Sequence, residues 1–202
     1  MKKITSIVLT GGPCAGKSKS IIELKNNLSK YGYRVIIIPE IATEIRANGF
    51  LENIDKVAFQ KMIFEMQLFK ENLYRNMILK NNDYSKTILI LDRGLMDNKI
   101  YLSDEEFEEL ICEKKLTIES IFARYTAVYH LDSTAIQNNN SYEKSSNEYR
   151  LFTPTVAKKL NDSGIQVWKA HPNFYRISVE ENFERKLQKL NKSVLELLLN
   201  RN

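Results

Sequence analysis

Short uninterrupted runs of apolar residues alternate along this chain with longer segments in which apolar residues recur every three or four positions. Uninterrupted runs are typical of strands buried on both faces, and the wider spacing is typical of helices with one buried face. The runs predict strands at Ile4–Leu9, Arg34–Ile38, Thr87–Leu91, Ala127–Leu131 and Ile165–Trp168, with Tyr175–Ile177 as a sixth candidate.

Glycines and capping residues set the ends of the predicted helices. Helices are expected at Lys17–Tyr31, Ile41–Asn48, Val57–Asn81 and Thr153–Ser163. Gly164 is expected to end the last of these. Capping boxes at Ser103–Glu106 and Ser178–Glu181 open two more helices.

Two of the helices are long enough to predict which face each one buries. The Val57–Asn81 helix is expected to bury Phe59, Ile63, Met66, Phe69, Leu73 and Met77. The terminal helix is expected to bury Phe183, Leu187, Leu190, Val194 and Leu197, and to expose a basic face of Arg185, Lys186, Lys189 and Lys192. That basic face is interpreted as solvated, with phospholipid contact as the less favoured alternative.

Strands and helices alternate throughout, with no internal repeat and no linker. This order predicts an α/β fold of three layers, in which helices cover both faces of a mostly parallel sheet, within one domain spanning residues 1–202. Sheets of this kind bind ligands at the carboxyl ends of their strands. Functional residues are therefore expected directly after strands.

The segment after the first strand, Gly11-Gly12-Pro13-Cys14-Ala15-Gly16-Lys17-Ser18, fits the phosphate-loop pattern G-x-x-x-x-G-K-[ST]. Glycines let the backbone wrap a phosphate, and the amides of residues 15–18 lie at the positive end of the following helix. Lys17 is expected at the β- and γ-phosphates and Ser18 at Mg²⁺, and Lys19 completes the predicted nucleotide contacts. The alternative is a chance glycine turn, which the strand–loop–helix context disfavours.

The third strand ends in Asp92, and a carboxylate in this position holds Mg²⁺ in phosphate-loop proteins. Arg93 follows, with a guanidinium suited to an anionic or hydroxyl-bearing acceptor, or to a salt bridge. Asp97 is interpreted as a solvated or capping residue in preference to a second ligand.

Three polar residues are candidates for contact with an acceptor molecule. Glu40 follows the second strand and would orient or deprotonate an attacking hydroxyl, or else stabilise the start of a helix. Arg46 would bind an acceptor phosphate or lie on the surface. Gln60 would contact a ring edge or be an exposed helix residue.

The polar segment of about 137–150 has no periodicity and is either a lid or disordered, and its position favours a lid. Arg150, at its end, is the preferred candidate for an arginine that stabilises charge on a transferred phosphoryl group, with Lys144 second.

Composition adds limits rather than a function. The chain has 202 residues, with 30 Lys plus Arg against 25 Asp plus Glu, and a net charge of +5 is too weak to indicate nucleic acid or a membrane. The presence of only two cysteines favours a reducing cytoplasm. No apolar run reaches the length of a membrane span. His130 and His171 have no Cys or His partners at the spacing of a zinc site. The oligomeric state is left open, a homodimer included.

Taken together, the phosphate loop with Pro39-Glu40, Phe59-Gln60, Leu91-Asp92-Arg93-Gly94, Trp168 and His171-Pro172 resembles the small AAA-domain phosphate-loop proteins. These include the nucleotide-binding half of the TRPL translocation defect proteins and the kinase-like domain of nicotinamide-riboside kinase regulators. The resemblance covers nearly the entire chain. It implies a five-stranded kinase-type fold with the Asp92 strand beside the first, and acceptor-facing roles for Glu40, Gln60, Asp92 and Arg93. A lid arginine of relatives matches Arg150.

Two functions follow as hypotheses. The first is an ATP·Mg²⁺-dependent kinase acting on a small nucleoside- or nucleotide-like acceptor. The second is a slowly hydrolysing ATP- or GTP-binding switch, with acidic phospholipids as its site of action. A nucleic-acid acceptor ranks low because no basic–aromatic platform is visible.

Overall fold

The computed structural model describes residues 4–49, 54–80, 84–133, 153–180 and 182–200. Within these residues the strands form one parallel sheet in the order β2-β3-β1-β4-β5. The strands are β1 (Thr5–Thr10), β2 (Arg34–Ile38), β3 (Thr87–Asp92), β4 (Ala127–Leu131) and β5 (Phe174–Ile177). The predicted α/β fold is confirmed, and β3, which ends in Asp92, lies beside β1 as expected.

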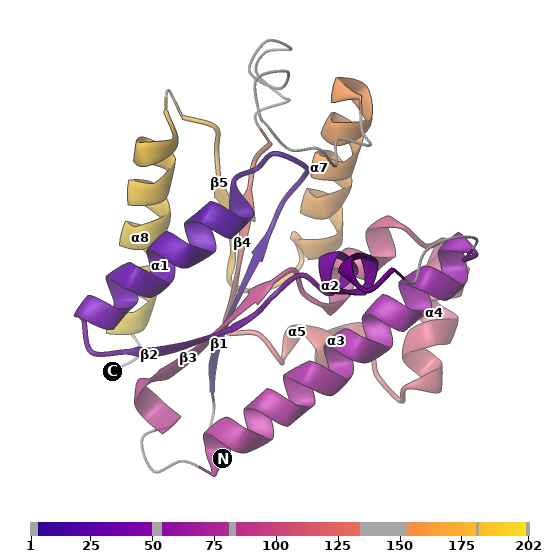
Figure 1. Ribbon diagram of the computed structural model, residues 1–202, viewed down its shortest axis with the longest axis horizontal. Coiled ribbons are helices and arrows are strands. Elements are labelled where there is room, and N and C mark those ends of the chain that lie inside the picture. Colours follow the sequence, from indigo (N-terminus) through magenta and orange to yellow (C-terminus); the bar gives the residue numbers. More distant parts are fainter. Residues whose placement is uncertain (1–3, 50–53, 81–83, 134–152, 181, 201–202) are drawn as a thin grey trace.

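Helices cover both faces of the sheet (Figure 1). Residues of β1 alternate between the two faces: Ile7 and Leu9 belong to the apolar core under α1 (Lys17–Lys30) and α8 (Phe183–Leu199), and Val8 belongs to the opposite core. That second core packs against α2 (Ile41–Ala47), α3 (Lys56–Leu79), η2 (Leu95–Ile100), α4 (Asp104–Glu113), α5 (Ile118–Phe122) and α7 (Pro154–Trp168). A short 3₁₀ helix, η1 (Tyr84–Lys86), precedes β3.

The strand predicted at Ile165–Trp168 is wrong, because these residues are the last turn of α7. Gly164 does not end the helix. It is buried where α7 crosses His130, and a Cβ at this position would lie 3.0 Å from the imidazole Cε1. The glycine therefore permits close packing in mid-helix, and the sixth candidate, Tyr175–Ile177, lies within the fifth strand instead.

The buried face predicted for α3 is right in the first half of the helix, where Ile63 is buried and Phe59 and Met66 pack against the core, and wrong in the second half. Phe69, Leu73 and Met77 are exposed, at 67%, 44% and 59% of their surfaces. The face turned inward carries Gln60, Ile63, Phe64, Gln67, Glu71 and Ile78. Polar side chains occupy half of these inward positions, so apolar periodicity could not locate the buried face.

The capping box predicted at Ser178–Glu181 does not open α8. Its N-cap is Asn182, whose side chain accepts a hydrogen bond from the Arg185 amide at 2.9 Å. The Ser178 hydroxyl instead donates to Glu180. The box predicted at Ser103–Glu106 is confirmed at the start of α4.

Two phenylalanines of α3 test the observed orientation. Phe64→Ala is expected to lower the free energy of unfolding by about 3–5 kcal/mol, because Phe64 is fully buried. Phe69→Ala is expected to change it by less than about 0.5 kcal/mol. Urea denaturation of both variants measures the difference. Equal losses would show that Phe69 packs against the core as firmly as Phe64, and would contradict the observed orientation of the helix.

Candidate functional site

The phosphate-loop segment connects β1 to α1 and follows a path that requires its glycines. Gly11 and Gly16 have φ of 144° and 82°. A Cβ on Gly11 would lie 2.2 Å from the Leu131 carbonyl oxygen, and one on Gly16 would lie 2.7 Å from the Phe183 ring. Both residues are therefore fixed by steric contact as well as by backbone conformation. Gly16 is also the N-cap of α1, so the following amides face the loop's hollow.

Side chains from distant segments hold the outer side of this loop. Lys186 of α8 donates from Nζ to the carbonyl oxygens of Ala15, at 2.8 Å, and Asp132, at 2.6 Å. The Ser133 hydroxyl donates to the Pro13 carbonyl at 2.5 Å. These bonds tie the loop to the end of β4 and to α8.

Lys186 is 3% exposed, so the prediction that it belongs to an exposed basic face is wrong. Burial lowers its pKa to about 8. The sequence could have predicted this burial, because Lys186 lies four residues before Leu190 and eight before Val194 and so shares the buried face of the helix.

Lys17 reaches back across the loop. Its Nζ lies 3.2 Å from the Gly11 carbonyl oxygen and 3.4 Å from that of Gly12. Burial and the nearby charge of Arg93 lower the pKa of Lys17 to about 8. The Lys17 ammonium therefore loses its proton at a lower pH than an ordinary lysine does. The negative charge of a phosphate bound in the loop would raise this pKa again.

Asp92 lies at the carboxyl end of β3, beside Lys17 and Arg93. Burial raises the pKa of Asp92, although the charges of Lys17 and Arg93 oppose this shift. Its Oδ1 is buried and has no hydrogen-bond partner among the described residues. Ser18 supplies a hydroxyl in the first turn of α1. One carboxylate with an unsatisfied oxygen and one hydroxyl fit a Mg²⁺ ion whose other ligands are water and phosphate oxygens. No group of three or more His, Cys, Asp or Glu suited to a metal occurs in the described ranges.

Glu40 and Arg93 form a direct ion pair from neighbouring strands. Arg93 Nε lies 2.6 Å from Glu40 Oε1, and the Thr43 hydroxyl donates to Glu40 Oε2 at 2.7 Å. Burial alone would raise the pKa of Glu40, but Arg93, Lys17 and Thr43 together lower it to about 2. Glu40 is thus a firmly ionised carboxylate with both oxygens engaged.

Three other predicted residues have partners outside this cluster. Gln60 is buried, and its Nε2 donates to Asn98 Oδ1 at 2.6 Å. The Arg46 guanidinium lies over the Phe59 ring at 5.6 Å, and the Lys19 ammonium lies over the Phe183 ring at 4.6 Å. Arg150, Lys144 and the predicted lid lie outside the described residues.

Asp97 has the capping role considered for it, in a buried setting. Its Oδ2 accepts hydrogen bonds from the Gly94 amide at 2.8 Å and from Trp168 Nε1 at 3.2 Å. Its Oδ1 accepts one from the Thr10 hydroxyl. Asp97 thus connects η2 to β1 and α7.

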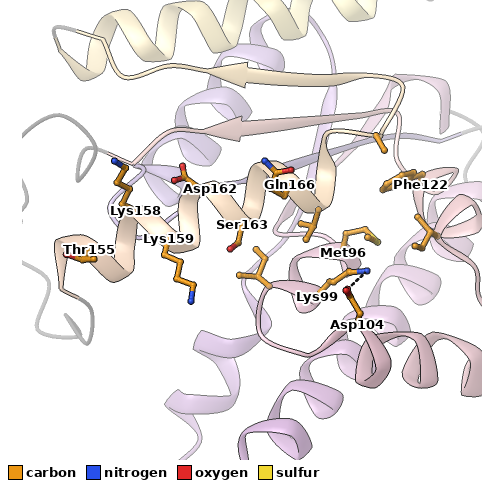
Figure 2. Close-up of a pocket in the computed structure, with 14 residues that line it drawn as sticks. Met96, Lys99, Asp104, Phe122, Thr155, Lys158, Lys159, Asp162, Ser163 and Gln166 are labelled. Carbon is orange, nitrogen blue, oxygen red and sulfur yellow. Dashed lines mark ion pairs between the residues drawn. The ribbon is translucent and has the colours of Figure 1, made fainter.

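A cavity of about 750 Å³ lies between η2, α5 and α7, as Figure 2 shows. None of its lining residues is a predicted site residue. Met96 and Phe122 line it with apolar surface, and Lys99 and Asp104 form an ion pair at 2.8 Å on its edge. Met96 and Lys99 of η2 line this cavity, whereas Asp97 of η2 faces Thr10 and Arg93. The cavity is therefore separate from the charged residues around Lys17.

The parallel sheet, the loop between β1 and α1 and the carboxylate after β3 define a phosphate-loop domain of the nucleotide-binding class. The chain belongs to the AAA domain family, whose model matches residues 6–186. The family resemblance is thereby confirmed; the particular relatives that it suggested are not. No curated protein matches the chain. In the described part of the chain, no helix is both long and apolar enough to cross a membrane.

Glu40→Gln tests the ion pair. Because the pKa of Glu40 falls from 4.5 to about 2 on folding, its charge stabilises the protein fully above pH 4.5, and this contribution is lost as pH falls toward 2. The variant is expected to lose about 2 kcal/mol of unfolding free energy at pH 7. Denaturation at several pH values should show the deficit shrinking below pH 4.5. A deficit independent of pH would contradict the proposed cause.

Proposed function

We propose that this protein is a phosphotransferase that moves the γ-phosphoryl group of ATP·Mg²⁺ to a small nucleoside- or nucleotide-like acceptor. The observation that carries this proposal is the Glu40–Arg93 pair beside Lys17 and Asp92. Triphosphate binding requires the loop, its lysine and a metal carboxylate. A further ionised pair at the same edge of the sheet supplies groups for a second substrate.

Each residue of the cluster has a role in this reaction. The loop amides and Lys17 would bind the β- and γ-phosphates, and Ser18 and Asp92 would hold Mg²⁺. Bound there, the ion would neutralise charge on the phosphate oxygens. Arg93, with Arg150 brought in by a lid, would stabilise charge on the transferred group.

Glu40 is proposed to orient the acceptor hydroxyl rather than to deprotonate it. A carboxylate with a pKa of about 2 is a weak base near neutral pH. Phosphoryl transfer passes through a loose transition state that needs little base catalysis, so orientation is the more useful contribution. Arg46 and Gln60 are proposed to complete the acceptor site.

The structure offers less to the alternative, a cytoplasmic nucleotide switch acting at acidic phospholipids. Lys186 is buried, and Lys189 pairs with Glu180 at 2.5 Å. Two of the four basic residues predicted for the exposed face of α8 are therefore already engaged within the protein.

The direct test incubates the protein with ATP or GTP, Mg²⁺ and a panel of nucleosides, nucleotides and nicotinamide riboside, with phosphorus NMR as the readout. A new phosphoester resonance that disappears in Lys17→Ala is the expected result. Triphosphate hydrolysis without any phosphorylated acceptor would replace the kinase proposal with the NTPase alternative. No triphosphate binding at all would refute both.

The low pKa of Lys17 predicts a pH-dependent affinity. Triphosphate requires the protonated ammonium, so the affinity is expected to hold below pH 8 and to fall by up to tenfold per pH unit above it. Calorimetric titrations from pH 7 to 9.5 measure this. Lys17→Arg should flatten the profile, because arginine keeps its charge. A profile identical in both proteins would exclude Lys17 as the titrating group.

Asp92→Asn tests the proposed metal carboxylate. Removing the charge is expected to abolish most of the gain in triphosphate affinity that Mg²⁺ provides, and to leave metal-free binding within about threefold of the original. Binding is measured with Mg²⁺ and with EDTA. Asp104→Asn is a matched control, because Asp104 lies at the edge of the separate cavity. An unchanged effect of Mg²⁺ in Asp92→Asn would remove Asp92 from the metal site.

A further inference from the structure

The turn that follows β3 has an unfavourable backbone conformation. Arg93 has φ of 74°, in the left-handed region that a residue with a Cβ rarely adopts. Such a residue persists where its surroundings fix it in place. Asp92 is the last residue of β3 and Arg93 is the first residue of the turn, so whatever fixes the turn positions Arg93 directly and Asp92 through its neighbour.

Side chains hold the turn on both sides of Gly94. Before the glycine, the Arg93 carbonyl oxygen accepts a hydrogen bond from Gln67 Nε2 at 3.0 Å. After it, the Leu95 amide donates to the Tyr125 hydroxyl oxygen at 3.0 Å. Trp168 closes the third side, since a Cβ on Gly94 would lie 2.7 Å from its ring.

Gln67 and Tyr125 both contact one carboxylate, that of Glu71 in α3. The Tyr125 hydroxyl donates to Glu71 Oε1 at 2.8 Å, and Gln67 Nε2 lies 3.4 Å from the same oxygen. Arg124 Nε donates to Glu71 Oε2 at 2.9 Å. Glu71 has no exposed surface, so the carboxylate is stabilised by these contacts in place of water.

This arrangement explains the polar buried face of α3. Gln67 and Glu71 lie one helical turn apart and point inward, where apolar residues would give a simpler core. Their hydrogen bonds converge on the backbone of Arg93 and, through Tyr125, of Leu95. The polar face is therefore directed at the turn and not at the sheet in general.

We propose that Gln67, Glu71 and Tyr125 form a clamp that positions Asp92 and Arg93 for the phosphoryl-transfer site. These are positioning residues, because they act through the turn's backbone. The inference rests on the proposed function for its consequence, since a displaced turn moves the metal carboxylate and the guanidinium. The phosphate loop has supports of its own in Lys186 and Ser133, and it meets the turn where Arg93 Nη1 lies 3.4 Å from the Gly11 carbonyl oxygen.

Tyr125→Phe is the first test. The variant keeps the ring, which packs edge-on against Trp168 with centroids 5.6 Å apart, and removes the hydroxyl that joins Leu95 to Glu71. We expect the gain in triphosphate affinity that Mg²⁺ provides to fall about tenfold, as on loss of residues that orient metal ligands. Metal-free affinity should stay within about twofold, because Lys186 and Ser133 still hold the loop and Lys17 itself is unchanged.

Tyr129→Phe is the matched control. Tyr129 is also buried, and its hydroxyl contacts Ser193 at 3.4 Å in the core on the other side of the sheet. It should leave the effect of Mg²⁺ unchanged. Equal losses in the two variants would reduce the clamp to a general effect of removing a buried hydroxyl, and would overturn the proposal.

Gln67→Met gives a second, independent variant of similar size. It should reduce the effect of Mg²⁺ in the same way. The double variant with Tyr125→Phe should lose less than the product of the two single losses, since both residues act through one turn. A loss in the double variant equal to the product of the two single losses would show that the two residues act independently, and would contradict a shared clamp.

A nucleotide-free measurement separates the clamp from the proposed function. Hydrogen exchange of peptides covering residues 93–98 should rise at least tenfold in Tyr125→Phe and stay unchanged in Tyr129→Phe, because only the first variant removes the acceptor of the Leu95 amide. Unchanged exchange in Tyr125→Phe would overturn the clamp. If exchange rises and wild-type protein binds no triphosphate, the clamp stands and the phosphotransferase proposal fails.

Discussion

Lys17 and Arg93 face Glu40, Asp92 and Asp97 at one partly buried edge of the sheet, and the rest of the structure depends on keeping these charges in place. Their mutual attraction is strong because little water reaches them. The balance is uneven, however. Glu40 and Asp97 have close partners, whereas Asp92 keeps a buried oxygen without one among the described residues. A divalent cation together with a triphosphate would supply what Asp92 and Lys17 each lack.

The charges are held by two separate supports. Lys186 and Ser133 bind carbonyl groups on the outer side of the phosphate loop. Gln67, Glu71 and Tyr125 bind the turn after β3. The supports come from α8 and the residues after β4 on one side, and from α3 and the residues before β4 on the other. The loop and the turn also meet directly, because Arg93 Nη1 lies 3.4 Å from the Gly11 carbonyl oxygen.

The sequence predicted the parts of this arrangement that depend on local pattern. Apolar runs placed β1 to β4, and the rule that ligands bind at strand ends brought Lys17, Glu40, Asp92 and Arg93 to one edge. The failures have a common cause. Gly164 lies inside a helix because it packs against His130, where a Cβ would be too close, and Glu71 is buried with Tyr125 and Arg124 as its partners. These partners lie 34 to 54 residues away in the chain, beyond the reach of any periodicity.

Buried polar groups of this kind carry a cost in stability. Well-packed apolar residues in place of an ionic network are often neutral or stabilising, so the Glu71 network is weak as an explanation of stability. Its value lies in geometry. An apolar contact tolerates sliding, whereas hydrogen bonds to the Arg93 carbonyl and the Leu95 amide fix one conformation of a turn whose φ is unfavourable. Phosphoryl transfer depends on positioning more than on chemistry supplied by the protein. In the proposed phosphotransferase, the buried charge and amide groups of α3 would therefore contribute position rather than stability.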